Sequence, residues 1–139
     1  TIVVKELTSL SVSGFGDVQV ETLSTPSMNI DMSGAGKIVQ NQLSTDKLDV
    51  SLSGAGGIDI SGKATQATVD ISGAGSVNAP DLQIQTADVT ISGLGSATLW
   101  VTDQLTGNIS GAGSVSYYGN PQTNTNSTGL GKFNSLGNK

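Results

Sequence analysis

The sequence predicts an all-β protein, a right-handed parallel β-helix (β-solenoid) of about seven coils with a repeat of 18–20 residues. Three observations support this fold class. A Ser-Gly-Ala-Gly motif recurs along the chain, apolar and polar residues alternate at the strand period of two, and no segment has apolar residues at helical spacing. A unit this short cannot bury its own apolar face, so it has to stack on its neighbours.

The turn motif occurs seven times. Four copies read Ser-Gly-Ala-Gly, the other three have Phe15, Leu94 or Leu130 between the glycines, and the last copy begins with Thr128 instead of serine. Successive first glycines are 20, 20, 19, 20, 18 and 18 residues apart. We interpret both glycines of each copy as structural turn residues, because a Cβ in a stacked column would meet the neighbouring coil and a sharp corner can require a positive φ. These glycines are Gly14, Gly16, Gly34, Gly36, Gly54, Gly56, Gly73, Gly75, Gly93, Gly95, Gly111, Gly113, Gly129 and Gly131.

Alignment on the first glycine separates inward from outward positions. Two columns are almost entirely apolar and are expected in the core. They are Val12, Met32, Leu52, Ile71, Ile91, Ile109 and Ser127 two residues before the glycine, and Val18, Ile38, Ile58, Val77, Ala97, Val115 and Phe133 four residues after it. The column three residues before the glycine has no apolar member and is expected to face water.

We expect a single solenoid domain over residues 1–139, with N-terminal edge strands in 1–12, regular coils in 13–118 and a polar C-terminal coil and tail in 119–139. Residues 122–127 place polar side chains at inward positions, as an atypical terminal repeat does. At the other end Ile2, Val3 and Val4 lie in an apolar, β-branched segment and form a candidate self-association edge. Its partner is either an upstream segment of the same polypeptide or a second copy, making a fibre or a dimer.

The composition excludes several classes of function. The chain has no Cys, His or Arg, and six lysines against eleven carboxylates give a net charge of −5. We therefore expect no nucleic-acid partner, no cofactor, no metal site and no histidine- or cysteine-based catalysis. No apolar run approaches the roughly 18 residues of a membrane span, so we expect no membrane insertion.

The carboxylates alternate from coil to coil. Asp31 and Asp70 share one outward column, and Asp49 and Asp88 share the column two residues earlier. This arrangement favours a solvated face that limits repulsion, with a weak divalent-cation stripe as the lesser alternative. No acid, base and substrate anchor converge, so we expect no enzyme activity. The alternative function is a polysaccharide hydrolase or lyase on a solenoid scaffold.

The most specific exposed feature is aromatic. Pro80, Trp100 and Tyr118 each lie seven residues past a first glycine in three successive coils, on the outward phase. We expect them to form one column that contacts a sugar face or an apolar patch of a partner. The alternative is that the rings cover only each other and a loop.

The Ser-Gly-Ala-Gly repeats, together with the stretch Val115–Pro121 and the following Thr128–Gly131, resemble the bacterial family of putative auto-transporter adhesins, head GIN domain. The resemblance covers nearly the whole chain from about Leu7. We expect the chain to differ from members of this family in lacking the strand-rich segment that precedes the repeats. The resemblance implies a parallel β-helix exported to the cell surface, the periplasm or the extracellular space. The expected function is a non-enzymatic structural or adhesive surface module that self-associates through coil ends or contacts cell-surface glycan.

Overall fold

The computed structural model describes residues 9–20 and 23–137, which contain strands and no helix. The strands are β1 (Ser9–Val12), β2 (Phe15–Val20), β3 (Leu23–Met32), β4 (Ala35–Leu52), β5 (Gly57–Ile71), β6 (Ser76–Ile91), β7 (Ser96–Ile109), β8 (Ser114–Tyr118), β9 (Gln122–Ser127) and β10 (Lys132–Ser135).

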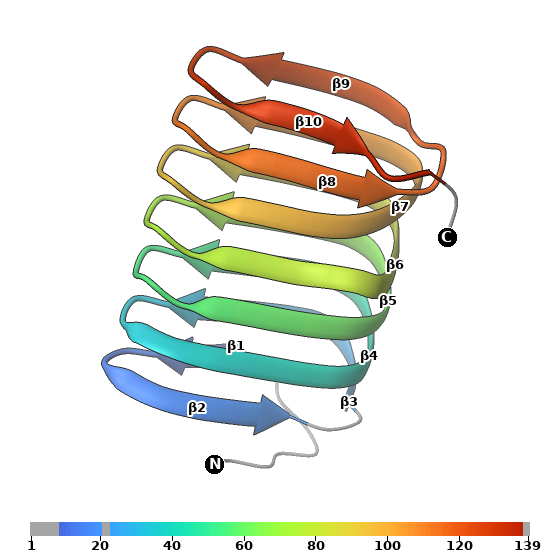
Figure 1. Ribbon diagram of the computed structural model, residues 1–139. Coiled ribbons are helices and arrows are strands. Elements are labelled where there is room, and N and C mark those ends of the chain that lie inside the picture. The colour runs from blue at the N-terminus through green and yellow to red at the C-terminus, as the bar shows by residue number, and fades with distance from the viewer. Residues whose placement is uncertain (1–8, 21–22, 138–139) are drawn as a thin grey trace.

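All strand pairs are parallel, and each coil pairs with the next one along the chain. The described residues form a β-solenoid of about six turns, close to the seven that the repeat predicts. In Figure 1 the chain crosses the near face from left to right, returns across the far face and rises toward the C-terminus, so the helix is right-handed. The strands β4 to β7 each wrap from the near face to the far face around the rounded edge.

The two inward columns lie where the repeat predicts them. Met32 pairs with Leu52, and this column continues through Ile71, Ile91 and Ile109, all of which are fully buried. The second column includes Ile38, Ile58, Val77, Ala97 and Val115, which are also buried. The apolar interior therefore runs the length of the stack between the two faces, because every second side chain points inward.

The glycine turns continue the hydrogen-bond ladder around the sharp edge. Ser72 N–H donates to Leu52 O at 2.9 Å, and Ala74 N–H donates to Gly54 O at 3.1 Å. A Cβ added at Gly34, Gly54 or any later motif glycine would come within 3.0 Å of the preceding coil. The expected packing role is therefore correct, whereas the expected positive φ is found only at Gly14 among the fourteen motif glycines. Gly14 and Gly16 belong to the first described coil and meet no described atom within 4 Å.

The C-terminal coil differs from the others in its inward residues. Thr123, Thr125 and Ser127 occupy the positions that Leu105, Gly107 and Ile109 hold one coil earlier, and β9 is exposed along its length. The Phe133 ring, which is partly buried against the core, fills the space beside Gly107. The polar terminal coil that the sequence predicts is therefore present, with one aromatic ring packed beneath it. Ile2, Val3 and Val4 lie outside the described residues.

Candidate functional site

An outward row of side chains runs parallel to the solenoid axis across six coils, and we call it the aromatic row. The strand register places its members side by side in the order Ser24, Ser44, Lys63, Gln83, Trp100 and Tyr118. Its last two members are the two large aromatic residues expected to form a column. The row therefore changes from polar to aromatic between β6 and β7.

Trp100 and Tyr118 are neighbours on β7 and β8, and both side chains are half-buried. The chain leaves β8 through Gly119, which has a φ of +98° and donates its N–H to Gly137 O at 2.7 Å. A Cβ at Gly119 would lie 3.4 Å from Cδ1 of Trp100, so the indole lies close to this turn. The two rings are thus held at the end of a strand pair, with part of each surface open to solvent.

Pro80 lies outside this row, which corrects the expected column of three. Ala79 pairs with Leu99, but the next pair is Gln83 with Trp100, so residues 80–82 form a bulge in the pairing of β6 with β7. Proline has no N–H to donate to a ladder and is confined to bulges and edges, which accounts for its position. Pro80 instead lines a separate hollow of about 310 Å³ together with Asn41, Asp59 and Asp81.

A polar groove lies beside the aromatic row where β4, β5, β6 and β7 round the edge of the solenoid. Its volume is about 390 Å³. We call it the edge groove; it is lined by Ser44, Thr45, Asp46, Lys63, Ala64, Thr65, Gln83, Gln85, Thr102 and Asp103. Three of these residues, Ser44, Lys63 and Gln83, also belong to the aromatic row, so the groove and the rings form one continuous surface.

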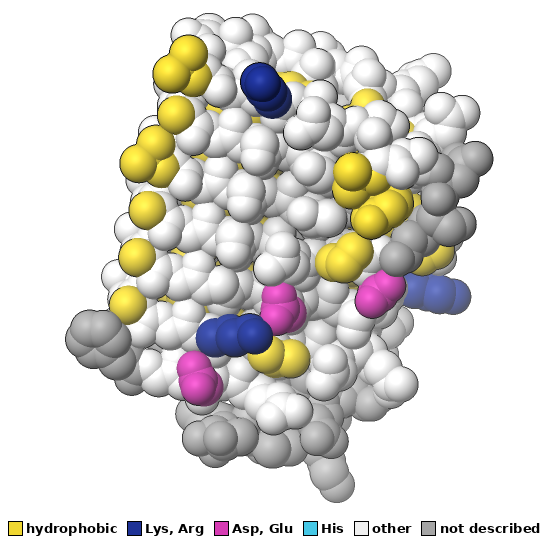
Figure 2. Space-filling model, in the orientation of Figure 1, with side chains coloured by type: hydrophobic (Ala, Val, Ile, Leu, Met, Phe, Trp, Pro, Cys, Tyr) yellow, Lys and Arg dark blue, Asp and Glu magenta, His cyan; other side chains and the backbone are white. Residues whose placement is uncertain are grey.

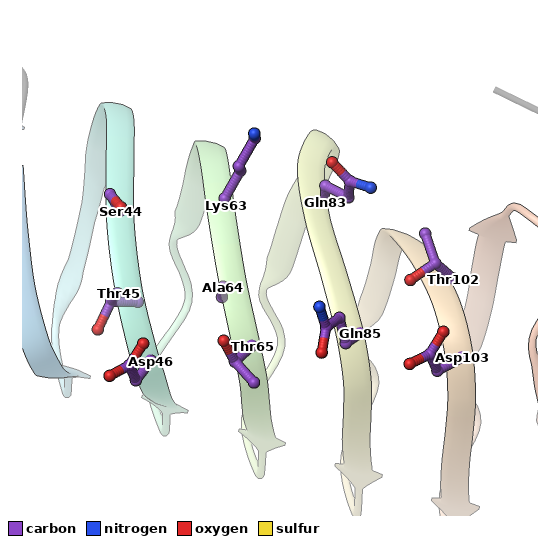
Figure 3. A pocket seen from close by; sticks show the side chains of 10 residues that line it. All are labelled: Ser44, Thr45, Asp46, Lys63, Ala64, Thr65, Gln83, Gln85, Thr102 and Asp103. Atoms are coloured by element: carbon purple, nitrogen blue, oxygen red, sulfur yellow. The ribbon is translucent and has the colours of Figure 1, made fainter.

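The polar side chains of the edge groove are arranged in coil order. Figure 3 shows Asp46, Thr65, Gln85 and Asp103 following one another, one from each of the four strands. All four are exposed. Carboxylate oxygens therefore lie at both ends of the groove, and hydroxyl and amide groups lie between them.

The local order of this edge depends on side chains that satisfy the backbone. Thr45 is buried and its Oγ1 donates to Lys47 O at 2.9 Å, while Thr102 Oγ1 donates to Ile84 O at 3.3 Å. Both threonines therefore direct their hydroxyls at backbone carbonyls, and the neighbouring Asp46 and Asp103 face solvent. The exposed polar atoms of the groove are therefore those of its carboxylates and amides together with Ser44, Lys63 and Thr65.

The aspartate alternation expected from the sequence is present on the far face. Asp49 and Asp88 share one row with Thr68 between them, and Asp31 and Asp70 share another with Ser51 between them. Within residues 9–20 and 23–137, no three His, Cys, Asp or Glu side chains gather in a group that could hold a metal ion. On the near face Lys37 Nζ lies 3.3 Å from Asp59 Oδ2.

The edge groove is not predicted by the sequence pattern. Its residues lie midway between two glycine turns, where the coils change from 20 to 18 residues and the register shifts at two places between β6 and β7. The change in spacing between successive glycines is the signal that could have located it. Counting residues from the first glycine of the motif places Trp100 and Tyr118 in one column correctly, because their two coils have the same 18-residue spacing.

The family comparison agrees with this architecture. The sequence profile of the family described as "Putative auto-transporter adhesin, head GIN domain" matches residues 1–121. The chain belongs to this family. Membership indicates a module of the cell surface or the extracellular space, and the family is named for adhesins and not for an enzyme. None of the curated proteins compared with the chain matches it.

Three solved structures have the same fold. A putative adhesin from Bacteroides fragilis is 28% identical with a TM-score of 0.90, over 94% of this chain and 61% of that one. A putative lipid binding protein from Parabacteroides distasonis is 26% identical with a TM-score of 0.82, over 96% and 57%. A putative adhesin from Parabacteroides merdae is 25% identical with a TM-score of 0.78, over 95% and 63%. The chain thus spans about three-fifths of the length of these relatives. Within its described part, no helix is long and apolar enough to cross a membrane.

Proposed function

We propose that this domain is a non-enzymatic adhesive module of the cell surface that binds glycan through Trp100 and Tyr118. The observation that carries the proposal is the aromatic row, in which two partly exposed rings continue a polar groove. The apolar C–H face of a pyranose ring packs on an aromatic ring, and polar groups beside it bind the hydroxyls. Because both rings are already half-buried, little side-chain freedom is lost when a ligand binds.

The spacing of the groove carboxylates supports binding in place of hydrolysis. Asp46 and Asp103 are three coils apart, roughly 14 Å at the usual strand spacing. Glycosidases hold their two carboxyl groups about 5–5.5 Å apart for retention or about 6.5–9.5 Å apart for inversion. Neither geometry is available between these two side chains, so the groove fits a ligand that is held and not cleaved.

The test uses Trp100 as its own reporter, because it is the only tryptophan of the chain. A panel of oligosaccharides is titrated while indole fluorescence and binding heat are followed. We expect at least one glycan to shift the fluorescence, and we expect Tyr118→Ala to weaken its binding about tenfold or more, measured by calorimetry. Trp100→Ala is expected to weaken binding at least as much. The proposal fails if no glycan binds, or if both variants bind as the parent does.

Lipid contact is a second candidate, favoured by an exposed apolar line along the sharp edge. Leu94 is 69% exposed and Leu130 is 84% exposed. Both occupy the middle of a glycine turn, where four other coils carry alanine, and Figure 2 shows hydrophobic side chains following this edge from coil to coil. The P. distasonis relative is described as a putative lipid binding protein. The line is only one side chain wide, so we favour the aromatic row.

The double variant Leu94→Ala, Leu130→Ala separates the two candidates. Its sugar binding is expected to equal that of the parent, because the sharp edge and the aromatic row are on different parts of the coil. Sedimentation with phospholipid vesicles provides the second arm. Vesicle binding by the parent that is lost in this variant, with no glycan binding, would replace the glycan proposal with lipid contact.

A further inference from the structure

We infer that the ligand is a linear, neutral oligosaccharide that lies parallel to the solenoid axis, from Tyr118 and Trp100 into the edge groove as far as Asp46. This inference rests on the proposed function and adds the orientation, length and charge of the ligand. It is carried by the register that makes the aromatic row and the edge groove one surface.

The spacing of the coils sets the orientation. Neighbouring members of the row are one strand spacing apart, about 4.8 Å. A pyranose unit in an extended chain has a similar length, so successive sugars can meet successive coils. A chain that lies across the coils would instead meet one or two strands and then leave the surface. The row from Tyr118 to Ser44 therefore offers one contact position in each of five successive coils.

Along this path the side chains change from aromatic to polar, and a sugar chain can bind to both kinds of surface. The rings at Tyr118 and Trp100 offer flat apolar surfaces for one or two sugar faces. Further along, the amides of Gln83 and Gln85 can both donate and accept hydrogen bonds. The carboxylates of Asp46 and Asp103 accept from paired hydroxyls, and charge-assisted bonds of this kind are the strong ones. Hydroxyl recognition thus extends beyond the stacking surface.

The charge of the groove selects against acidic glycans. Two exposed carboxylates, Asp46 and Asp103, lie in it with one lysine, Lys63, and the whole chain has a net charge of −5. A uronate or sulfate group would meet net repulsion along most of the path. A neutral hexose chain carries no such cost and supplies the hydroxyl donors that carboxylates require.

The decisive experiment measures affinity against chain length for neutral gluco-, manno- and galacto-oligosaccharides of one to six residues. We expect affinity to rise with each added sugar up to about five, the number of coils from Tyr118 to Ser44. Asp46→Ala is expected to weaken the binding of the hexasaccharide about tenfold and to leave the disaccharide unchanged. Trp100→Ala is expected to weaken both.

Asp49→Ala is the matched control, because Asp49 is an exposed aspartate of the same strand and lies in a row of the far face. It should bind every chain length as the parent does. Equal affinity for two and six sugars, or no effect of Asp46→Ala, overturns the axial orientation while binding at Trp100 leaves the proposed function intact. Tighter binding of an oligogalacturonate than of neutral oligomers overturns the neutral ligand. Binding of no sugar at all overturns both the proposed function and this inference.

Discussion

From the second coil onward, the motif glycines are required by contact with the preceding coil and not by backbone conformation. A Cβ at Gly36 would meet the backbone of Gly16, and a Cβ at Gly54 would meet that of Gly34. Their φ angles lie outside the left-handed region. Any side chain at these positions would separate the turn from the coil beneath it, so the requirement for glycine comes from the stack and begins with the second coil.

The first prediction compares Gly36→Ala with Gly16→Ala. Gly36→Ala is expected to destabilise the fold by about 2–3 kcal/mol, because the new methyl group has to displace the backbone of the preceding coil. Gly16 has the same place in the motif but meets no described atom within 4 Å. Gly16→Ala should therefore be neutral or stabilising by up to about 1 kcal/mol. Urea unfolding of both variants measures the difference.

Equal losses of stability in these two variants would contradict the contact explanation. Asp70→Asn provides the baseline for a harmless change on the surface, since Asp70 is exposed on the far face. It is expected to change the free energy of unfolding by no more than about 0.5 kcal/mol.

Residues close to a glycine turn could be predicted from the sequence, and residues at the rounded edge could not. Met32, Leu52 and Ile71 keep a constant distance from the turn, so a count from the glycine assigns them to the core correctly. Pro80 lies beyond a point where the coils differ in length, and the count fails there. Inside and outside alternate at period two, so the pattern is lost wherever one coil has extra residues.

At the scale of single elements, the C-terminal coil replaces apolar packing with one aromatic ring. Gly107 occupies an inward row of β7 whose earlier members are Val69 and Val89. The Phe133 ring fills the space beside it, from a different strand of the last coil. The large Phe133 side chain thus fills the space that the missing side chain of Gly107 leaves in the core, close to the end of the stack.

The second prediction is a double-mutant cycle at this pair. Phe133→Ala is expected to cost about 2 kcal/mol, less than for a fully buried ring, because Phe133 is only partly buried. Gly107→Val alone is expected to cost about 1–3 kcal/mol, because its side chain would meet the ring. The double variant restores the valine row and should lose about 1–2 kcal/mol less than the sum of the two. Thermal and urea unfolding of the four proteins provide the cycle.

Additive losses would show that the ring and the glycine do not compensate each other. Leu136→Ala is the control for the tail after β10, since Leu136 is 45% exposed. A change in that variant comparable to Phe133→Ala would mean that the tail as a whole, and not the ring, stabilises the last coil.

The sequence alone identified this terminal element only in part. The polar residues at 122–127 predict a terminal coil, because inward positions without apolar side chains cannot support another coil. The pairing of Phe133 with Gly107 joins residues of different coils on opposite faces of the core. Their positions in the repeat do not predict this contact, because it depends on the space that Gly107 leaves in the core.

At the scale of the whole molecule, side chains at equivalent positions of successive coils form straight rows along the solenoid. The function depends on the chemistry of the exposed rows. The far face carries aspartates separated by neutral residues, and the near face carries the ion pair of Lys37 with Asp59. Among the described residues, the rounded edge joins a groove to aromatic rings. The relatives share the rows as a scaffold, with TM-scores of 0.78 to 0.90 at 25% to 28% identity, so row residues can vary while the stack persists.

The two ends of the stack lead to the last prediction, which concerns assembly of the 139-residue chain. At the C-terminal end, the exposed β9 offers Thr123, Thr125 and Ser127 where a further coil would need apolar neighbours. We therefore expect that end not to add coils from another copy, so head-to-tail growth into a fibre is not expected. The segment with Ile2, Val3 and Val4, which lies outside the described residues, carries the predicted self-association edge. If two copies associate through the same N-terminal segment, each covers the edge of the other, and no third copy can add.

We therefore expect a concentration-dependent equilibrium between monomer and dimer, with no larger species. Light scattering across a concentration series measures it, and Val4→Lys is expected to shift the equilibrium to monomer by placing a charge in the apolar segment predicted to self-associate. Lys132→Ala, a change at the exposed C-terminal end, should leave it unaltered. A strictly monomeric parent at high concentration would contradict the predicted self-association through the N-terminal segment. Species larger than a dimer would contradict the predicted limit of two copies, because they would require the polar C-terminal coil to bind a partner.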